Sequence, residues 1–319
     1  MKTFYEIKPG LLKRSSLALG FFDGVHPGHQ AVIKKAVSEA AIHDAVPAVI
    51  TFKEHPRALT LGKSPPLLTL PEQRLEICEE LGIEAALILS FTEELCRLAP
   101  ADYVQQVLVE SMGACSLSVG FNHRFGRNRV GTPELLAELG KDMGFSVHVA
   151  PEVDIDGAPV SSSRIREALS QSDVELARKL LGRPYAVHGQ VVRGDGRGKS
   201  IGFPTANVEC AEELIIPARG VYSGYCRLEN GNNYACVINV GLRPTFGESN
   251  LSKTEVHIFD FNADIYDQYM TVRFLNFIRQ ERKFAGIDEL KAQILADCET
   301  AKKHLSGDKA IASLGGSLI

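Results

Sequence analysis

The segment FFDGVHPGHQAV, Phe21 to Val32, joins an apolar stretch to a helix-like one. The residues before it, SSLALG, favour a buried strand, and the residues after it, QAVIKKAVSEAA, have apolar side chains at helical spacing. His26 and His29 therefore lie where a strand gives way to the first turn of a helix. A strand followed directly by a helix begins a β-α-β unit, so this stretch decides the fold class of the first half.

The rest of the first half repeats the same alternation. Short apolar runs predict strands, and runs with apolar residues at i, i+3 and i+4 predict helices. The strands are expected at 16–20, 47–52, 85–91, 116–120 and 146–150, and the helices at 28–45, 71–82, 101–113 and 132–144. This α/β pattern predicts a Rossmann-like parallel sheet with helices on both faces and ligands beyond the carboxyl ends of the strands.

The pattern changes near residue 183. Two short helices are expected at 161–170 and 172–182, the second capped by Asp173 and ended by Gly182. Strands then follow closely, and a final amphipathic helix can cover an open side of a small barrel or sandwich. The strands are expected at 185–192, 220–230, 233–241, 254–261 and 270–278, and the helix at 288–305. We therefore expect a first domain over 1–182, a second over 183–306 and a loose tail over 307–319.

Composition restricts the class of protein. The chain has 319 residues, 45% of them hydrophobic and 23% charged, with a formal net charge of −4, which argues against an obligate nucleic-acid partner. No apolar run is long enough to span a membrane, and the first ten residues do not resemble a signal peptide. Seven scattered cysteines without a CxxC pair favour reduced thiols over disulfides or a zinc site. We expect a cytoplasmic protein that binds neither nucleic acid nor membrane, and leave its oligomeric state open.

The two histidines suit anion chemistry. The first N–H groups of a helix lack partners and face the positive end of its dipole, which makes an anion site. Both imidazoles can donate hydrogen bonds to phosphate oxygens, and Gly28 allows close approach to the backbone. Such donors would stabilise charge during attack on the α-phosphate of a nucleoside triphosphate. The alternatives are an ordinary turn with surface histidines and a zinc pair, for which no further ligand cluster is evident.

A second group of candidate binding residues lies at the start of the second half. The run RGDGRGKS is not a Walker A loop, because Arg193 replaces the first glycine and Gly202 and Pro204 prevent a following helix. What remains is a glycine-rich loop that can bend around phosphates. Thr205 and Asn207 then offer two neutral oxygens on one face of a strand, a partial shell for Mg²⁺. Taken alone, PTAN is better explained as a turn before an edge strand.

Several first-half motifs resemble one known family. GFFDGVHPGHQ and TFKEHP are similar to the FMN adenylyltransferase half of bacterial riboflavin kinase/FAD synthetases, within the HxGH nucleotidyltransferase superfamily. VGFNHRFGRNRVG resembles that family's flavin-side loop, and VSSSRIREALS resembles its phosphate-binding ISSTxIR motif. The resemblance implies catalytic roles for His26 and His29, phosphate contacts by Gly28, Ser162, Ser163, Arg164 and Arg166, and flavin contacts by Asn122 and Phe125. Phe21, Glu54, His123, Val160 and Ser163 depart from the family pattern.

The second-half motifs resemble riboflavin kinases. GRGKSIGFPTAN, IIPARGVYSG, INVGLRPTF, TEVHIFDF and IRQERKF occur in that family's order, so the resemblance extends to about residue 305. It implies that Glu255 takes the proton from the riboflavin 5′-hydroxyl. It also implies ATP contacts by Gly196, Gly198 and Lys199, a flavin contact by Arg279, and Mg²⁺ ligation by Thr205 and Asn207. Without the resemblance, Glu255 is equally well explained as a solvated acid at a strand edge.

Together the motifs imply a bifunctional enzyme of flavin cofactor synthesis. Its barrel would phosphorylate riboflavin with Mg-ATP to give FMN, and its first domain would adenylylate FMN to FAD with release of pyrophosphate. Three alternatives stand beside it. An RNA-linked protein with an HxGH motif is disfavoured by the acidic charge and the lack of a KMSKS-type loop. A flavin-binding regulator without activity is disfavoured because the apparent catalytic positions are intact. An adenylyltransferase with another acceptor is disfavoured by the kinase half.

Overall fold

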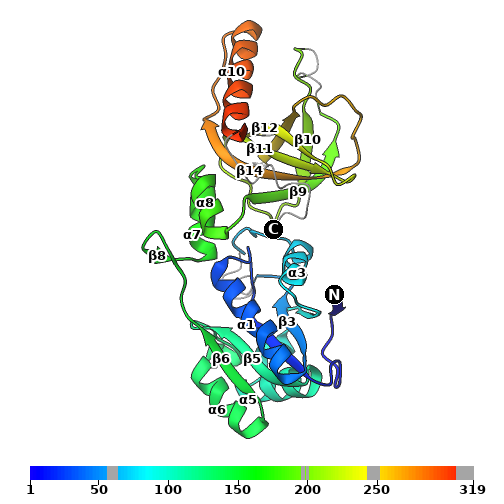
Figure 1. Ribbon diagram of the computed structural model, residues 1–319, viewed down its shortest axis with the longest axis vertical. Helices are drawn as coiled ribbons and strands as arrows, with labels where there is room; N and C mark the ends of the chain where they lie inside the picture. Colours follow the sequence, from blue (N-terminus) through cyan, green and yellow to red (C-terminus); the bar gives the residue numbers. More distant parts are fainter. Residues whose placement is uncertain (56–63, 195–197, 199–200, 243–251, 307–319) are drawn as a thin grey trace. The chain divides into compact units, whose positions relative to one another are not determined.

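The computed structural model describes residues 1–55, 64–194, 198, 201–242 and 252–306. The chain divides into two compact units, Met1–Ser162 and Ser163–Ile319. Each unit has its own sheet, as Figure 1 shows for each in turn, and its own hydrophobic core.

The first unit is built on a six-stranded parallel sheet with strand order β1-β4-β3-β2-β5-β6. The predicted parallel sheet is confirmed, and an unpredicted strand, β1, is added at its edge. The strands are β1 (Lys2–Phe4), β2 (Ser15–Leu19), β3 (Val46–Phe52), β4 (Ala85–Leu89), β5 (Ala114–Gly120) and β6 (Ser146–Ala150). The short strands β7 (Asp154–Ile155) and β8 (Ala158–Pro159) form a separate hairpin.

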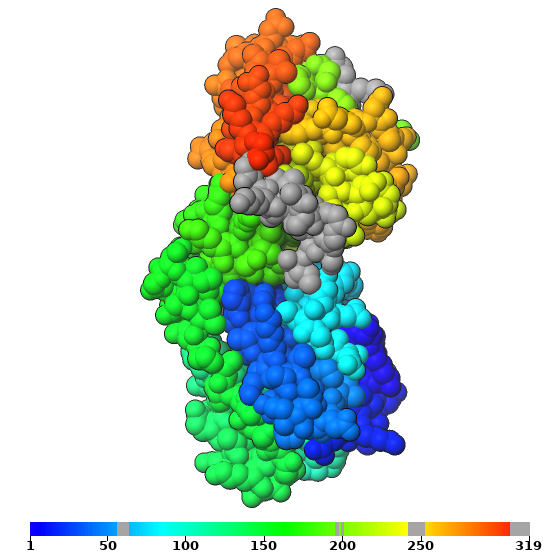
Figure 2. All heavy atoms as spheres, in the orientation of Figure 1, coloured from blue at the N-terminus to red at the C-terminus, as the bar shows by residue number. Residues whose placement is uncertain are grey.

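Helices cover both faces of this sheet, as predicted. Side chains of β2 alternate, so that Leu17 and Leu19 pack against one helical layer and Ala18 packs against the other. The first layer contains α5 (Pro100–Tyr103), which continues as the π-helical segment η1 (Val104–Ser111), and α6 (Pro133–Met143). The opposite layer contains α1 (Pro27–His43) and α3 (Pro71–Glu80), and Figure 2 shows α1 along one face of this unit in blue. The short segments α4 (Glu93–Arg97) and η2 (Arg127–Arg129) lie in loops.

The strand order defines a switch point between β2 and β5. From β2 the chain proceeds through α1 to β3 and β4, and then returns to the other side of β2 as β5. Leu19 and Val119 are neighbours at the carboxyl ends of these two strands. Ligands of open α/β sheets bind at such a point, so the loops after β2 and β5 are placed where a site is expected.

The second unit is a closed antiparallel barrel with strand order β10-β13-β12-β11-β14-β9. Its strands are β9 (Tyr185–Val192), β10 (Ala206–Cys210), β11 (Gly220–Leu228), β12 (Asn233–Leu242), β13 (Ser252–Ile258) and β14 (Tyr269–Arg279). The amphipathic helix α10 (Ile287–Ser306) packs on one side through Cys298, Ala301 and Leu305, which contact Val221 and neighbouring apolar residues. Figure 2 shows α10, in orange to red, exposed along its other side.

The helices α7 (Ser162–Ser170) and α8 (Val174–Leu181) belong to the second unit by their contacts. The backbone N–H of Phe277 in β14 donates to Glu175 Oε1 at 3.1 Å, and the N–H of Ala218 donates to the Leu169 carbonyl at 2.9 Å. The predicted capping of α8 is confirmed, because Asp173 accepts from the N–H of Leu176 and Gly182 is left-handed. The predicted domain boundary at 182/183 concerns independent folding and stays a prediction.

All seven cysteines lie within the described residues and are free thiols. No helix in the described part of the chain is both long and apolar enough to cross a bilayer.

A buried acid near the end of α1 contributes to the first unit's stability. Glu39 Oε1 lies 2.6 Å from Lys35 Nζ, and Oε2 lies 3.2 Å from His148 Nε2 and 3.5 Å from His43 Nε2. The Lys35 hydrogen bond, assisted by both histidines, lowers the pKa of Glu39 against the opposing effect of burial. The carboxylate therefore links α1 to β6.

We predict that Glu39→Gln lowers the free energy of unfolding by about 1–3 kcal/mol at pH 7, the usual range for a hydrogen bond to a charged group. Because the folded-state pKa lies below the unfolded value, this contribution is present above that value and is lost as pH falls through the folded pKa. Urea unfolding followed by circular dichroism at pH 7 and pH 4 measures it. Glu93→Gln, which breaks the exposed pair with Arg97, is the matched control and should change nothing measurable.

Candidate active sites

The loop between β2 and α1 has an unusual backbone. Phe22 and Val25 are non-glycine residues with φ values of 56° and 38°, in the left-handed region. Both are fully buried. Such conformations cost on the order of 1–3 kcal/mol each and persist only where surrounding contacts determine them.

Asp23 provides those contacts from the middle of the loop. Its buried carboxylate accepts hydrogen bonds from the N–H of Leu68 at 3.0 and 3.1 Å, and from the N–H and hydroxyl of Thr69 at 3.0 and 3.2 Å. The Thr69 hydroxyl in turn accepts from the N–H of Gly24 at 3.0 Å. One carboxylate thus joins the β2–α1 loop to the segment that precedes α3.

Arg74 is the cation that accompanies Asp23. It is fully buried, donates to Thr51 Oγ1 and the Phe52 carbonyl at 3.1 and 2.9 Å, and lies over the Phe21 ring at 4.2 Å. Burial lowers the pKa of Arg74, and Asp23 opposes that effect. The sequence analysis did not identify Asp23 or Arg74, because neither stands out until the loop and α3 are seen together.

His26 and His29 meet at the first turn of α1, as predicted. His26 is the N-cap, and its Nδ1 accepts from the N–H of His29 at 3.4 Å. The two rings stack with centroids 3.7 Å apart. A neutral imidazole that accepts at Nδ1 carries its proton on Nε2, so the His26 ring is a hydrogen-bond donor at Nε2.

Gly28 has a local reason to be glycine. A Cβ atom at this position would lie 3.2 Å from Cε1 and 3.3 Å from Nδ1 of His26. The missing side chain therefore allows the His26 ring to pack against the start of α1. The phosphate contact expected at Gly28 stays a prediction.

One of the predicted phosphate-binding residues also reaches the loop. Ser162 Oγ donates to the backbone carbonyl of Asp23 at 2.9 Å. Ser163, Arg164 and Arg166 follow on α7 in the second unit, and their contacts with phosphate stay predictions.

The loop after β5, for which the sequence predicts flavin contacts, is exposed at Asn122 and buried at Phe125. Asn122 is exposed, whereas Phe125 is buried beside Tyr103 in the core of the first unit. His123 stacks on Phe125, and burial, with help from Arg129 and Arg124, lowers the pKa of His123 to about 4. His123 is therefore a neutral ring near pH 7. The flavin contacts predicted for Asn122 and Phe125 stay predictions.

In the barrel, strand register aligns three polar residues. Glu255 of β13 lies directly opposite Asn207 of β10 on one side and Asn239 of β12 on the other. Asn239 Nδ2 donates to Glu255 Oε2 at 3.3 Å, and Lys253 Nζ lies 2.7 Å from Glu255 Oε1. Opposite residues in neighbouring strands share a face, so the three form one polar row.

The predicted metal ligands lie at the end of this row. Asn207 is 8% exposed, and its Oδ1 is buried without a hydrogen-bond partner among the described residues. Thr205 Oγ1 lies 3.2 Å from where a Cβ on Gly198 would stand, so Gly198 brings the loop backbone close to Thr205. An unpartnered buried amide oxygen fits a hard cation such as Mg²⁺, and the Thr205 hydroxyl would be a second neutral ligand of the same kind. Gly196 and Lys199 lie outside the described residues.

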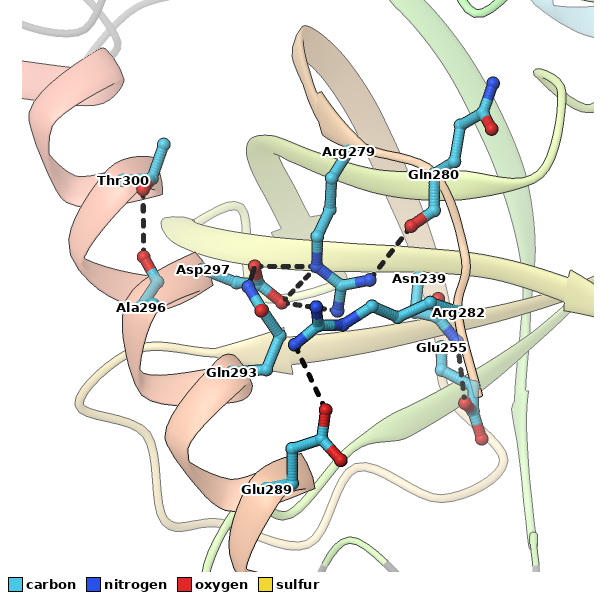
Figure 3. Close-up of polar contacts among 10 residues, drawn as sticks. All are labelled: Asn239, Glu255, Arg279, Gln280, Arg282, Glu289, Gln293, Ala296, Asp297 and Thr300. Atoms are coloured by element: carbon cyan, nitrogen blue, oxygen red, sulfur yellow. Dashed lines mark hydrogen bonds and ion pairs between the residues drawn. The ribbon is translucent and has the colours of Figure 1, made fainter. Parts of the chain in front are cut away.

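Arg279, at the end of β14, is paired with α10. Its Nε and Nη2 donate to the carboxylate of Asp297 at distances from 2.7 to 3.1 Å, and its Nη1 donates to the Gln280 carbonyl (Figure 3). Asp297 is buried and also accepts from Gln293 at 2.8 Å. The structure gives Arg279 a role in fixing α10, and its predicted flavin contact stays a prediction. Asn239, Lys253 and Asp297 were not identified from the sequence.

The fold and both sites define a two-part transferase: a parallel-sheet unit with an HxGH helix start, and an antiparallel barrel with a polar row for phosphate chemistry. Comparison with known proteins agrees with this class. The family model for FAD synthetase matches residues 9–164, and the model for riboflavin kinase matches residues 181–305.

Named relatives match nearly the whole chain. A bifunctional riboflavin kinase/FMN adenylyltransferase from Bacillus subtilis is 38% identical, with 96% of this chain and 99% of the relative covered. One from Pseudomonas fluorescens is 37% identical, with 89% and 91% covered. The chain belongs to the bifunctional riboflavin kinase/FMN adenylyltransferase family. It converts riboflavin to FMN and FMN to FAD, with ATP as co-substrate.

A solved structure with the same fold carries a different description. It is described as a macrolide-efflux protein from Streptococcus pneumoniae, and it matches with a TM-score of 0.87 and 31% identity over 95% of this chain and 99% of its own. The agreement extends across both units, so it supports the fold. The efflux description is a statement about that protein.

Gly194 gives a prediction specific to the barrel. A Cβ at this position would lie 2.1 Å from Asn207 Nδ2 and 2.6 Å from its Cγ, so Gly194→Ala must displace the Asn207 side chain. We expect FMN formation to fall by roughly 10-fold or more, because misplacing a site group by about 1 Å can cost 10² in rate. FAD formation from supplied FMN should not change. Gly286→Ala, where a Cβ meets nothing within 4 Å, is the control. Wild-type kinase kinetics in Gly194→Ala would contradict the expected role of Asn207.

Proposed function

We propose that the two activities reside in separate halves of the chain, with adenylyl transfer in the first and riboflavin phosphorylation in the barrel. The family models support this division, because each covers one half. We propose domains over 1–182 and 183–306, with 307–319 as a tail.

In the adenylyl-transfer half, the histidine pair would bind the ATP phosphates. A phosphate oxygen of FMN attacks the α-phosphorus, the bond to the β-phosphate oxygen breaks, and pyrophosphate leaves. His26 and His29 would donate hydrogen bonds to the phosphate oxygens on which charge grows. Gly28, which has no side chain, would let these oxygens reach the start of α1. Ser162, Ser163, Arg164 and Arg166 would bind the phosphate tail, and Asn122 and Phe125 would contact the flavin.

In the kinase half, the polar row would activate the acceptor. The riboflavin 5′-oxygen attacks the γ-phosphorus, its proton passes to the Glu255 carboxylate, and ADP leaves. General-base help of this kind is worth typically ~10²–10⁴ in rate. Gly196, Gly198 and Lys199 would hold ATP, and Arg279 would contact the flavin through N–H groups that Asp297 and Gln280 do not engage.

Mg²⁺ is the cofactor that we propose for the kinase half. The observation that carries this assignment is that Asn207 Oδ1 is buried without a hydrogen-bond partner among the described residues. Asn207 lies directly opposite Glu255 on the neighbouring strand. Thr205 and Asn207 would hold the ion, and when bound it would neutralise charge on the ATP phosphates. Neither step needs a covalent enzyme intermediate, so positioning and charge stabilisation supply the catalysis.

We also propose that the enzyme works in the cytoplasm on small molecules, without a nucleic-acid or membrane partner. Seven free cysteines suit a reducing compartment, and the net charge of −4 gives no general attraction for nucleic acid.

Two substitutions should separate the activities. We predict that His29→Ala lowers FAD formation from FMN by about 10²–10³, the usual effect of losing one donor to transition-state charge, and leaves FMN formation unchanged. Glu255→Gln should do the reverse, lowering FMN formation by about 10²–10⁴. The assay separates flavins chromatographically after incubation with Mg-ATP and either riboflavin or FMN. Equal loss of both activities in either folded variant would refute separate sites.

Fragments provide an independent test of the proposed division. We predict that Met1–Gly182 makes FAD from FMN but not from riboflavin, and that Arg183–Ser306 makes FMN but never FAD. A longer barrel fragment, Ser163–Ser306, keeps α8 on β9 and β14 and should unfold at a higher urea concentration. FAD from either barrel fragment would contradict the assignment. Activity in only the longer one would move the boundary to the start of α7.

A further inference from the structure

Both carboxylate oxygens of Glu255 are held by neighbouring side chains. Asn239 lies directly opposite on β12 and donates from Nδ2 to Oε2 at 3.3 Å, as the dashed line in Figure 3 shows. Lys253 precedes Glu255 by two positions on the same strand face, and its Nζ lies 2.7 Å from Oε1. The two contacts come from different strands and engage different oxygens.

This arrangement fixes the plane of the carboxylate. A carboxylate rotates about its terminal bond unless both oxygens are engaged, because that torsion is broad. Each oxygen can accept two hydrogen bonds, so one lone pair on each is left after Asn239 and Lys253 are satisfied. The Lys253 and Glu255 side chains are only 23% and 27% exposed, so solvent screens this pair less than a surface pair.

The carboxylate of Glu281 lies close to the face of β12 that carries Asn239. Gly241 follows on the same face of β12, and a Cβ there would lie 2.6 Å from Glu281 Oε1 and 3.7 Å from Asn239 Nδ2. The Glu281 carboxylate thus fills the position where a larger residue on β12 would stand.

We propose that Asn239 and Lys253 are positioning residues that aim a free lone pair of Glu255 at the riboflavin 5′-hydroxyl. This inference rests on the general-base role proposed above for Glu255. Neither residue needs to touch substrate, so losing either should reduce turnover more than substrate affinity. A base held in the wrong plane still occupies the site but accepts the proton poorly.

The test uses the full chain and measures kcat and KM for FMN formation, with riboflavin and Mg-ATP varied in turn. Asn239→Ala should lower kcat by roughly 10- to 100-fold, with both KM values within about twofold of wild type. The isosteric Asn239→Asp keeps the shape, replaces the donor by a like charge and should lose at least as much. Lys253→Met should lose roughly 3- to 10-fold, and Lys253→Arg should recover most of it, because the pair is partly exposed. Asn232→Ala, in the exposed turn before β12, is the matched control and should behave as wild type.

A double-mutant cycle distinguishes positioning from a structural role. In a Glu255→Gln background, Asn239→Ala should cause no more than about a further twofold loss, because groups that act through one another are not additive. Circular dichroism and the urea midpoint of the same samples report that the barrel is folded, because the first half is expected to make FAD without it. Full additivity in the cycle, a change confined to KM, or wild-type kcat in Asn239→Ala would overturn the inference while leaving Glu255 as the base. Wild-type activity in Glu255→Gln would instead remove the proposed base and this inference together.

Discussion

In the first unit, the loop that carries the histidine pair depends on the buried carboxylate of Asp23. The chain must turn from the end of β2 into α1 within a few residues, and it does so with Phe22 and Val25 in the left-handed region. The hydrogen bonds that Asp23 accepts from Leu68 and Thr69 offset the cost of this backbone. Its carbonyl also accepts from Ser162, so the histidine turn and the start of α7 are positioned by the same residue.

The barrel positions its chemistry by a different means. Here no strained loop is needed, because antiparallel register alone places Asn207, Glu255 and Asn239 opposite one another. A slip of one residue in either pairing would turn the row to the opposite face, so the ladder that holds the barrel together also specifies the site. Two glycines leave space around the polar row. Gly194 leaves room for the Asn207 side chain, and Gly241 leaves room for the Glu281 carboxylate.

Local patterns predicted most of the fold, whereas contacts between distant segments could not be predicted from them. The alternation of strands and helices gave the parallel sheet, and the HPGH segment and the β13 glutamate were found from their motifs. The edge strand β1 was missed because Lys2–Phe4 is too short to show a period. Asp23 and Arg74 were missed because their partnership arises only when α3 packs beside the loop. The packing of α8 on β9 and β14 could likewise not be predicted, because a helix has the same caps and the same periodicity wherever it packs.

The pairing of Arg279 with Asp297 shows how the covering helix contributes to the kinase half. A buried ion pair adds little net stability, because desolvation offsets most of the attraction, but breaking it leaves an uncompensated charge. The ion pair therefore favours a single packing position of α10 against the end of β14. Gln293 donates a further hydrogen bond to the Asp297 carboxylate. Glu281, whose carboxylate lies close to Gly241 of β12, follows Arg279 by two residues, so the residue that fixes α10 and the acid beside β12 belong to one short stretch at the end of β14.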